Sequence, residues 1–195
     1  YSKEEIVKIA SLAKQYGATL IVDELYSRQV FDGRTYTHLC AQAERPDNMV
    51  TIIGPSKTES LSGYRLGVAF GSAAIIERME KLQAIVSLRA PGYCQAVFAS
   101  WFAEPEGWME QRVAEHQAIR DSLLAKFLAC PGVTARATEA GSCLFPKLPP
   151  LAVSGVDFVK ILRADANVTV TPGTEFGAQF TDRFRINFSQ HRKAG

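Results

Sequence analysis

Two apolar runs in this chain each lead into residues whose side chains could do chemistry. The run at residues 18–22 ends in Asp23, and the run at residues 49–53 leads through a Gly-Pro pair into Ser56 and Lys57. In parallel α/β sheets, ligands bind at the carboxyl ends of the strands. If both runs are neighbouring strands, an acid and a lysine therefore face the same crevice.

From the residues alone, Lys57 could be a surface charge, a phosphate contact or a nucleophile, and an ion pair with Asp23 is a purely structural alternative. A lysine amine attacks a carbonyl carbon only when it is deprotonated, so a nucleophilic role needs a special site. Arg65 follows eight residues later. Its planar guanidinium suits a two-point contact with a phosphate group, which a lysine cannot make.

The elements that must position these residues alternate between helix and strand. Ser2 and Glu5 have the spacing of a capping box, which predicts the start of a helix, and Gly17 is its expected end. A continuous apolar run then predicts a strand buried on both faces of a parallel sheet. Further strands are expected at residues 48–54 and 66–72. This alternation predicts an α/β layer with a mostly parallel sheet.

A smaller α+β unit is expected in the last third of the chain. A helix at residues 73–89 and a helical zone at residues 94–128, interrupted near residues 104–107, come before it. After a Pro-Gly pair, the pattern predicts a helix flanked by short strands. The strands are expected at residues 133–137, 142–148, 168–172 and 183–189, and the helix at residues 156–165. The predicted organisation is residues 1–92, a helical connection at residues 93–130, and residues 131–195.

Composition argues against several classes of protein. The 195 residues carry a net charge of only +2, which gives no electrostatic case for binding nucleic acid or an acidic membrane. No apolar run has the roughly 20 residues of a membrane helix. The four cysteines and three histidines have no metal-ligand spacing. Free thiols in the reducing cytoplasm, and no metal, are the expectation.

Four segments resemble the C-terminal half of a fold-type-I aminotransferase of class I/II, the aspartate aminotransferase-like enzymes that depend on pyridoxal phosphate. The segments are VDELY, GPSKTESLSGYRLG, VTPGTEFG and RFRINFS, and they occur in the order found in the family. The second segment is the most specific, because it holds a lysine and an arginine at a fixed distance. The resemblance implies part of a large cofactor-binding domain, followed by a small C-terminal α+β domain.

The resemblance also implies a role for each residue of the site. Lys57 would form the aldimine with the cofactor aldehyde and, once freed, move a proton. Asp23 would pair with the pyridine nitrogen. Tyr26 would hydrogen-bond the cofactor's 3′-oxygen, although a core tyrosine is the alternative. Arg65 would clamp the phosphate, and Ser56 would add a hydroxyl to it.

Arg185 matches the arginine that receives the α-carboxylate of the substrate. A period of two places Arg185 on the strand face opposite the apolar residues, a face that the rival Arg183 shares. Residues 171–177 resemble the loop near the substrate entrance. In one respect the chain departs from the family: many members carry a hydroxyl residue three positions before the lysine, where Gly54 stands here.

The implied function is transfer of an amino group between an amino acid and a 2-oxo acid. The alternatives are a lyase, synthase or decarboxylase on the same fold, or a non-catalytic aminotransferase-like sensor domain. Family members are longer, and their N-terminal cofactor loop and C-terminal helix have no counterpart in these 195 residues. We therefore expect a fragment that binds the cofactor weakly and transaminates little alone. The intact enzyme is expected to be a cytoplasmic homodimer.

Overall fold

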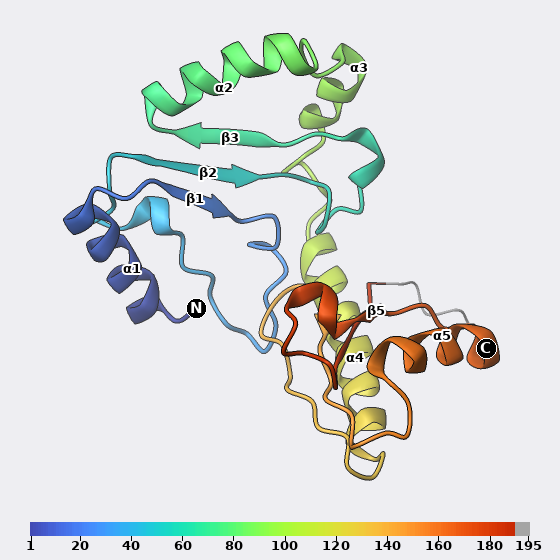
Figure 1. Ribbon diagram of the computed structural model, residues 1–195. Coiled ribbons are helices and arrows are strands. Elements are labelled where there is room, and N and C mark those ends of the chain that lie inside the picture. The colour runs from blue at the N-terminus through green and yellow to red at the C-terminus, as the bar shows by residue number, and fades with distance from the viewer. Residues whose placement is uncertain (190–195) are drawn as a thin grey trace. The chain divides into compact units, whose positions relative to one another are not determined.

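The computed structural model describes residues 1–189, which fall into two compact units (Figure 1). The first unit is Tyr1–Glu106 and the second begins at Gly107. Each unit has its own three-stranded sheet, with strand order β1-β2-β3 in the first and β4-β6-β5 in the second. The two units are therefore described separately.

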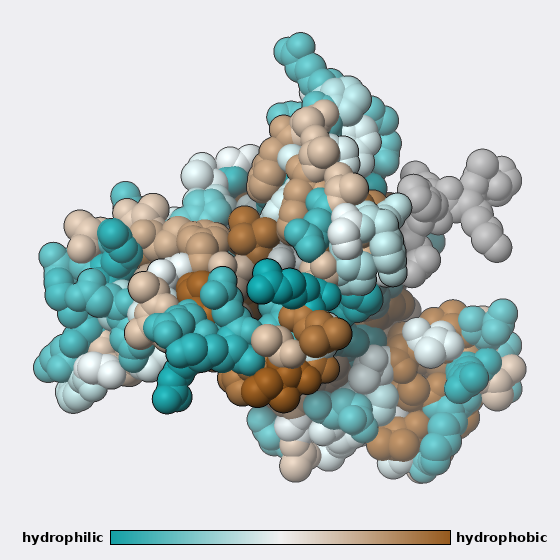
Figure 2. Space-filling view, turned by 90° about the horizontal axis from the view of Figure 1, so that it is seen from above, coloured by the Kyte–Doolittle hydropathy of each residue, from teal (hydrophilic) through white to brown (hydrophobic). Residues whose placement is uncertain are grey.

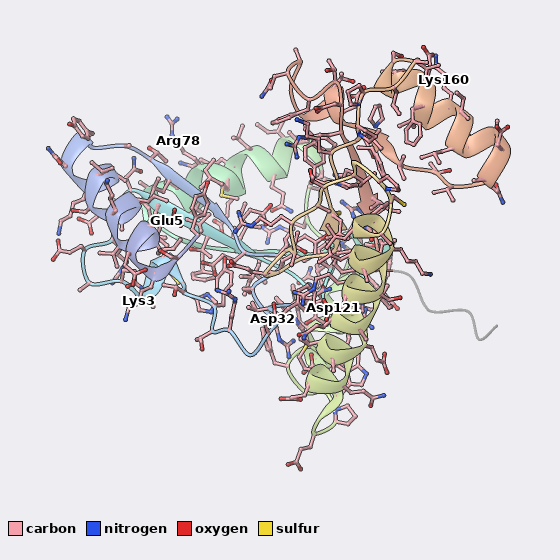
Figure 3. The ribbon with its side chains drawn as sticks, turned by 90° about the horizontal axis from the view of Figure 1, so that it is seen from below. Lys3, Glu5, Asp32, Arg78, Asp121 and Lys160 are labelled. Carbon is pink, nitrogen blue, oxygen red and sulfur yellow. The ribbon has the colours of Figure 1, made fainter. Side chains whose placement is uncertain are left out.

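Helix α1 (Lys3–Tyr16) begins and ends where the local signals predict. The hydroxyl of Ser2 accepts a hydrogen bond from the backbone N–H of Glu5, and the Glu5 carboxylate accepts one from the N–H of Ser2. Glu5 lies in the first turn of α1 (Figure 3). The helix stops at Gly17, whose φ of 61° is left-handed and suits glycine. The predicted capping box is confirmed.

The sheet of the first unit joins β1 (Leu20–Asp23), β2 (Met49–Ile53) and β3 (Val68–Gly71). Strands β1 and β2 are parallel, whereas β3 runs antiparallel to β2. Figure 1 shows the three strands side by side. Because β3 runs antiparallel to β2, its first residue lies beside the carboxyl ends of β1 and β2.

One face of β1 is half-buried and the other is exposed, so the prediction of burial on both faces was wrong for this chain. Leu20 and Val22 pack against a core that includes Ala10 of α1 and Met49 of β2. Ile21 points the other way and is 73% exposed. Successive strand side chains alternate between faces, and among the described residues only one face of β1 is covered.

Helix α2 (Ala73–Val86) has no buried residue. Large apolar side chains are exposed near its C-terminal end and just beyond, namely Leu82, Ile85, Val86 and Leu88. Apolar residues also reach the surface on the face shown in Figure 2, where brown and teal groups lie side by side. Within the described residues, α2 therefore presents an apolar surface without a partner.

Two short helical segments, α3 (Gly92–Gln95) and η3 (Ala96–Ala99), close the first unit. The helical zone is then interrupted, as predicted, before α4 begins at Trp108. None of the helices that the structure describes is long and apolar enough to cross a membrane. The four cysteines are free thiols.

The second unit packs α4 (Trp108–Leu128) and α5 (Gly155–Ala166) against β4 (Cys143–Leu144), β5 (Thr171–Pro172) and β6 (Phe184–Asn187). Its core contains Leu148, Val170 and Phe184, with Phe127, Phe158 and Leu162 packed around them. Lys160 lies on the exposed side of α5 (Figure 3).

The strand predicted at residues 133–137 is reduced to one antiparallel bridge between Thr134 and Lys147. Gly132 lies against Pro149 on one side of this bridge. Proline has no N–H group to donate, so the ladder cannot continue in that direction. The expectation of a strand was wrong here, although Val133 still packs on the core of the unit.

Candidate functional site

The predicted site residues of the first unit lie at the end of its sheet where β1 and β2 terminate. Asp23 is the last residue of β1 and lies opposite Ile52 of β2. The chain leaves β2 at Ile53 and returns to the same edge at Val68, which is the partner of Ile53. Everything between them, including Lys57, therefore belongs to a loop at the carboxyl ends of β1 and β2.

Lys57 is exposed, and its side chain extends toward Tyr26. The amine nitrogen lies 5.9 Å from the centre of the Tyr26 ring. Within residues 1–106, all of which the structure describes, the Lys57 amine has no carboxylate or hydrogen-bond partner. The structural ion pair with Asp23 is thus not formed, and the lysine amine stays available for another group.

Asp23 is exposed at the end of β1, with one carboxylate oxygen held by its own backbone. Its Oδ1 accepts a hydrogen bond of 3.1 Å from the backbone N–H of Leu25. This contact fixes the orientation of the carboxylate, and within residues 1–106 its second oxygen has no hydrogen-bond partner. We call residues 54–67, which connect β2 to β3, the lysine loop. Ser56 is half-buried near the start of this loop.

A buried acid lies directly behind Asp23, and sequence reasoning gave it no role. Glu24 is 2% exposed, and its Oε2 lies 2.6 Å from Nδ1 of His38. The Tyr36 ring packs against the His38 ring in a tilted arrangement, with the ring centres 4.8 Å apart. Burial, with help from the charges of Glu24 and Asp23, raises the pKa of Tyr36 to about 12. This cluster supports the loop that carries Asp23.

Arg65 has a backbone conformation that an arginine rarely adopts. Its φ of 52° and ψ of 46° are left-handed, and its Nη1 donates a 2.9 Å hydrogen bond to the carbonyl of Ser62. A Cβ atom makes this region unfavourable for every residue except glycine, and such residues cluster at functional sites. A pocket of about 340 Å³ adjoins it, lined by Gly63, Tyr64, Arg65, Pro91, Tyr93 and Cys94.

Gly54 has a physical reason to lack the hydroxyl side chain found in many family members. A Cβ at Gly54 would lie 3.0 Å from a methyl of Leu25 and 3.1 Å from the carbonyl of Leu66. The two ends of the lysine loop approach each other closely at this point. A serine here would require its neighbours to move by a few tenths of an ångström.

Arg183 and Arg185 are the two candidates for the arginine that binds the substrate carboxylate, and they have different surroundings in the second unit. Arg183 directly precedes β6 and Arg185 lies within it. Arg183 is half-buried, and its guanidinium lies near the rings of Phe145 and Phe180, at 5.7 and 5.9 Å. Arg185 is exposed on the opposite strand face from Phe184, as the period of two predicts. Its guanidinium lies 4.8 Å from the centre of the Phe176 ring. Of the two, Arg185 has the more accessible charge.

The turn after β5 brings the chain close to the start of β6. Gly173 donates a 2.7 Å hydrogen bond to the carbonyl of Arg183, and an added Cβ would overlap that carbonyl and the carbonyl of Phe180. Only glycine fits this close approach. The turn therefore fixes the segment Gly173–Phe176 beside Arg185.

Comparison with known proteins identifies the family. A crystal structure of an aspartate aminotransferase from Rhodobacter sphaeroides is 65% identical, with a TM-score of 0.95 over 97% of this chain and 49% of that one. Curated aspartate aminotransferases from Pyrococcus horikoshii and Bacillus subtilis are 25% and 28% identical over 98% and 91% of this chain.

These matches confirm the fold expected from the sequence. The chain spans about half the length of the curated relatives it matches. The family model described as aminotransferase class I and II matches residues 1–194. This chain belongs to the class I and II aminotransferase family.

Proposed function

We propose that the protein carrying this chain is a pyridoxal-phosphate-dependent aminotransferase that moves an amino group between an amino acid and a 2-oxo acid. One observation carries the proposal. Asp23 ends β1, and Lys57 and Arg65 lie in the loop between β2 and β3, at the end of the sheet where β1 and β2 terminate. The lysine amine lies near the Tyr26 ring and has no polar partner within residues 1–106. An acid, a free amine and a guanidinium are the groups that this cofactor requires.

The residues fit the cofactor group by group. Pyridoxal phosphate carries a phosphate ester, which suits the Arg65 guanidinium and the Ser56 hydroxyl. Its aldehyde suits the unpaired amine of Lys57. Its ring nitrogen suits the free carboxylate oxygen of Asp23, and its 3′-oxygen suits the hydroxyl of Tyr26. When bound, the cofactor supplies an electron-accepting ring that stabilises negative charge on the substrate α-carbon.

The protein's own residues then bind, orient and move protons. The Asp23 carboxylate keeps a proton on the ring nitrogen, since a negative charge beside that atom favours its charged form. The Lys57 amine is the base that takes the proton from the substrate α-carbon. The Arg185 guanidinium binds the substrate α-carboxylate through two parallel hydrogen bonds.

We further propose aspartate as the first amino donor to test, because the relative that is 65% identical bears the name aspartate aminotransferase. We also propose a cytoplasmic homodimer, which is what the family resemblance of the sequence implies. We also propose the division that the sequence indicates, with residues 1–92 as part of the cofactor domain, residues 93–130 as the connection and residues 131–195 as the small domain. No observation favours a lyase or a sensor domain over amino transfer.

A spectral titration of the full-length protein tests the proposal. Adding aspartate alone to the cofactor-loaded protein should remove the visible absorbance of the bound cofactor and release one 2-oxo acid per site. A later addition of a 2-oxo acid should restore the absorbance. Release of carbon dioxide or ammonia in place of this exchange would indicate a lyase or decarboxylase.

A further inference from the structure

A cluster of charges lies beside the site, entirely within the first unit. Arg28 donates a hydrogen bond of 2.6 Å to Oε1 of Glu59. The same nitrogen, Nη1, and its neighbour Nη2 donate two hydrogen bonds to Glu104, of 2.8 and 3.2 Å. The guanidinium also lies 4.6 Å from the centre of the Phe102 ring. One arginine therefore joins three separate segments of the chain.

Arg28 is a fixed anchor rather than a mobile surface charge. Its side chain is 24% exposed, and those of Glu59 and Glu104 are 5% and 16% exposed. Burial disfavours the charge of Arg28, but the hydrogen bonds and charges of the two glutamates outweigh it and raise the Arg28 pKa. The hydrogen bond from Arg28 lowers the pKa of Glu104. Two-point arginine–carboxylate contacts of this kind are directional.

The Arg28–Glu59 contact joins the two loops that carry the reactive groups. Arg28 lies two residues after Tyr26, and Glu59 lies two residues after Lys57. The second carboxylate oxygen of Glu59 accepts a hydrogen bond from the hydroxyl of the adjacent Thr58. The ion pair thus holds the backbone that follows Lys57 against the backbone that follows Tyr26.

The lysine loop is also held by buried residues beside Lys57, since Pro55 is less than 2% exposed and Thr58 is 3% exposed. Lys57 itself is exposed, and its amine lies 5.9 Å from the centre of the Tyr26 ring. The loop's own backbone bonds run from Ser60 to the Lys57 carbonyl at 3.4 Å and from Leu61 to the Pro55 carbonyl at 3.1 Å. These bonds shape the loop, but they do not set its distance from Tyr26.

We propose that Arg28 and Glu59 are positioning residues, whose ion pair sets the placement of the Lys57 amine relative to the Tyr26 hydroxyl and the bound cofactor. The proposal rests on the proposed function, because it assigns Lys57 the reactive amine. A misplacement of about 1 Å at a reacting group can cost about a hundredfold in rate. An ion pair two residues from each group controls displacements of this size.

The test compares Arg28→Gln, Arg28→Lys and Glu59→Gln with the wild type in the full-length, cofactor-loaded protein. Glu77→Gln is the matched control, because Glu77 forms an ion pair with Lys81 on the exposed surface of α2. Two quantities are measured, namely kcat for amino transfer at saturating substrate and the pH midpoint of the visible absorbance of the bound cofactor.

Positioning predicts that kcat falls about ten- to a hundredfold in all three variants, because each breaks the same geometry. Arg28→Lys is included because it keeps the charge and loses the planar guanidinium whose Nη1 and Nη2 make the two-point contact with Glu104. The pH midpoint should move in the same direction in Arg28→Gln and Glu59→Gln. Glu77→Gln should match the wild type in both quantities.

Charge acting through space predicts a different result. Arg28→Gln removes a positive charge and Glu59→Gln removes a negative one, so the two midpoints would move in opposite directions with kcat preserved. That result, or wild-type kcat in folded Glu59→Gln or Arg28→Lys, overturns the proposal. If Arg28→Gln does not fold, the other two variants decide. A wild-type protein that neither binds the cofactor nor transfers amino groups refutes the proposed function instead.

Discussion

Replacing Arg65 separates the binding role of its side chain from the strain of its backbone. In the structure Arg65 is left-handed, with φ 52°, and its guanidinium adjoins the pocket beside the lysine loop. We expect Arg65→Ala and Arg65→Gly to lose the phosphate contact equally. They should differ in stability, because only glycine adopts the left-handed region without a steric penalty.

The magnitudes follow from these two effects. Hydrogen bonds to a charged group contribute about 1.5–3 kcal/mol. Since about 1.4 kcal/mol corresponds to tenfold in affinity, both variants should bind pyridoxal phosphate about ten- to a hundredfold more weakly. The left-handed conformation costs a non-glycine residue roughly 1 kcal/mol, so Arg65→Gly should be more stable than Arg65→Ala by about that amount. Arg65→Lys should fall between the wild type and alanine in affinity.

The assay is a titration of the full-length apoprotein with pyridoxal phosphate and, in parallel, with pyridoxal, which lacks the phosphate. The loss of affinity should appear with pyridoxal phosphate only. Stability is measured by urea unfolding of the apoproteins. Equal losses with both ligands, or no loss with either, would refute the assignment of Arg65 to the phosphate. Equal stability of the glycine and alanine variants would refute the argument from backbone strain.

Two further predictions concern the second unit and the cluster behind Asp23. Gly173→Ala should destabilise the protein by a few kcal/mol in urea unfolding, because the new Cβ would lie 2.7 Å from the carbonyl of Arg183. Gly92→Ala is the control. Its new Cβ would meet no atom within 4 Å, so its stability should be nearly that of the wild type. Tyr36 has its pKa raised to about 12. Folding therefore favours the neutral form of Tyr36. The resulting contribution to the free energy of unfolding is full below pH 10 and is lost as the pH rises from 10 through 12. Tyr36→Phe should abolish this part of the alkaline loss of stability, and an unchanged pH profile would contradict the assignment.

The parts of the fold that depend on neighbours in sequence could be predicted. Ser2, Glu5 and Gly17 define α1 because capping is a local interaction within a few residues. The direction of β3 could not be predicted, because it depends on how the chain returns after the lysine loop. The open face of β1 is a similar case, since the apolar residue Ile21 fits a covered face as well as an exposed one.

The position of the candidate residues relative to the strands could be predicted. Asp23 ends β1 and Lys57 follows β2, and the parallel pairing of β1 with β2 places both at the same end of the sheet. The pair Arg28–Glu59 gave no such signal, because its members are 31 residues apart and charged residues in loops are usually solvated. Only the folded chain reveals that both are largely buried.

The most direct test of the account is to find which lysine bonds to the cofactor. The full-length protein is loaded with pyridoxal phosphate, reduced with borohydride, digested and analysed by mass spectrometry. The account predicts one modified peptide, with the cofactor mass on Lys57, and no modified peptide in Lys57→Ala. Cofactor found on a different lysine, or visible absorbance that persists in Lys57→Ala, would contradict it.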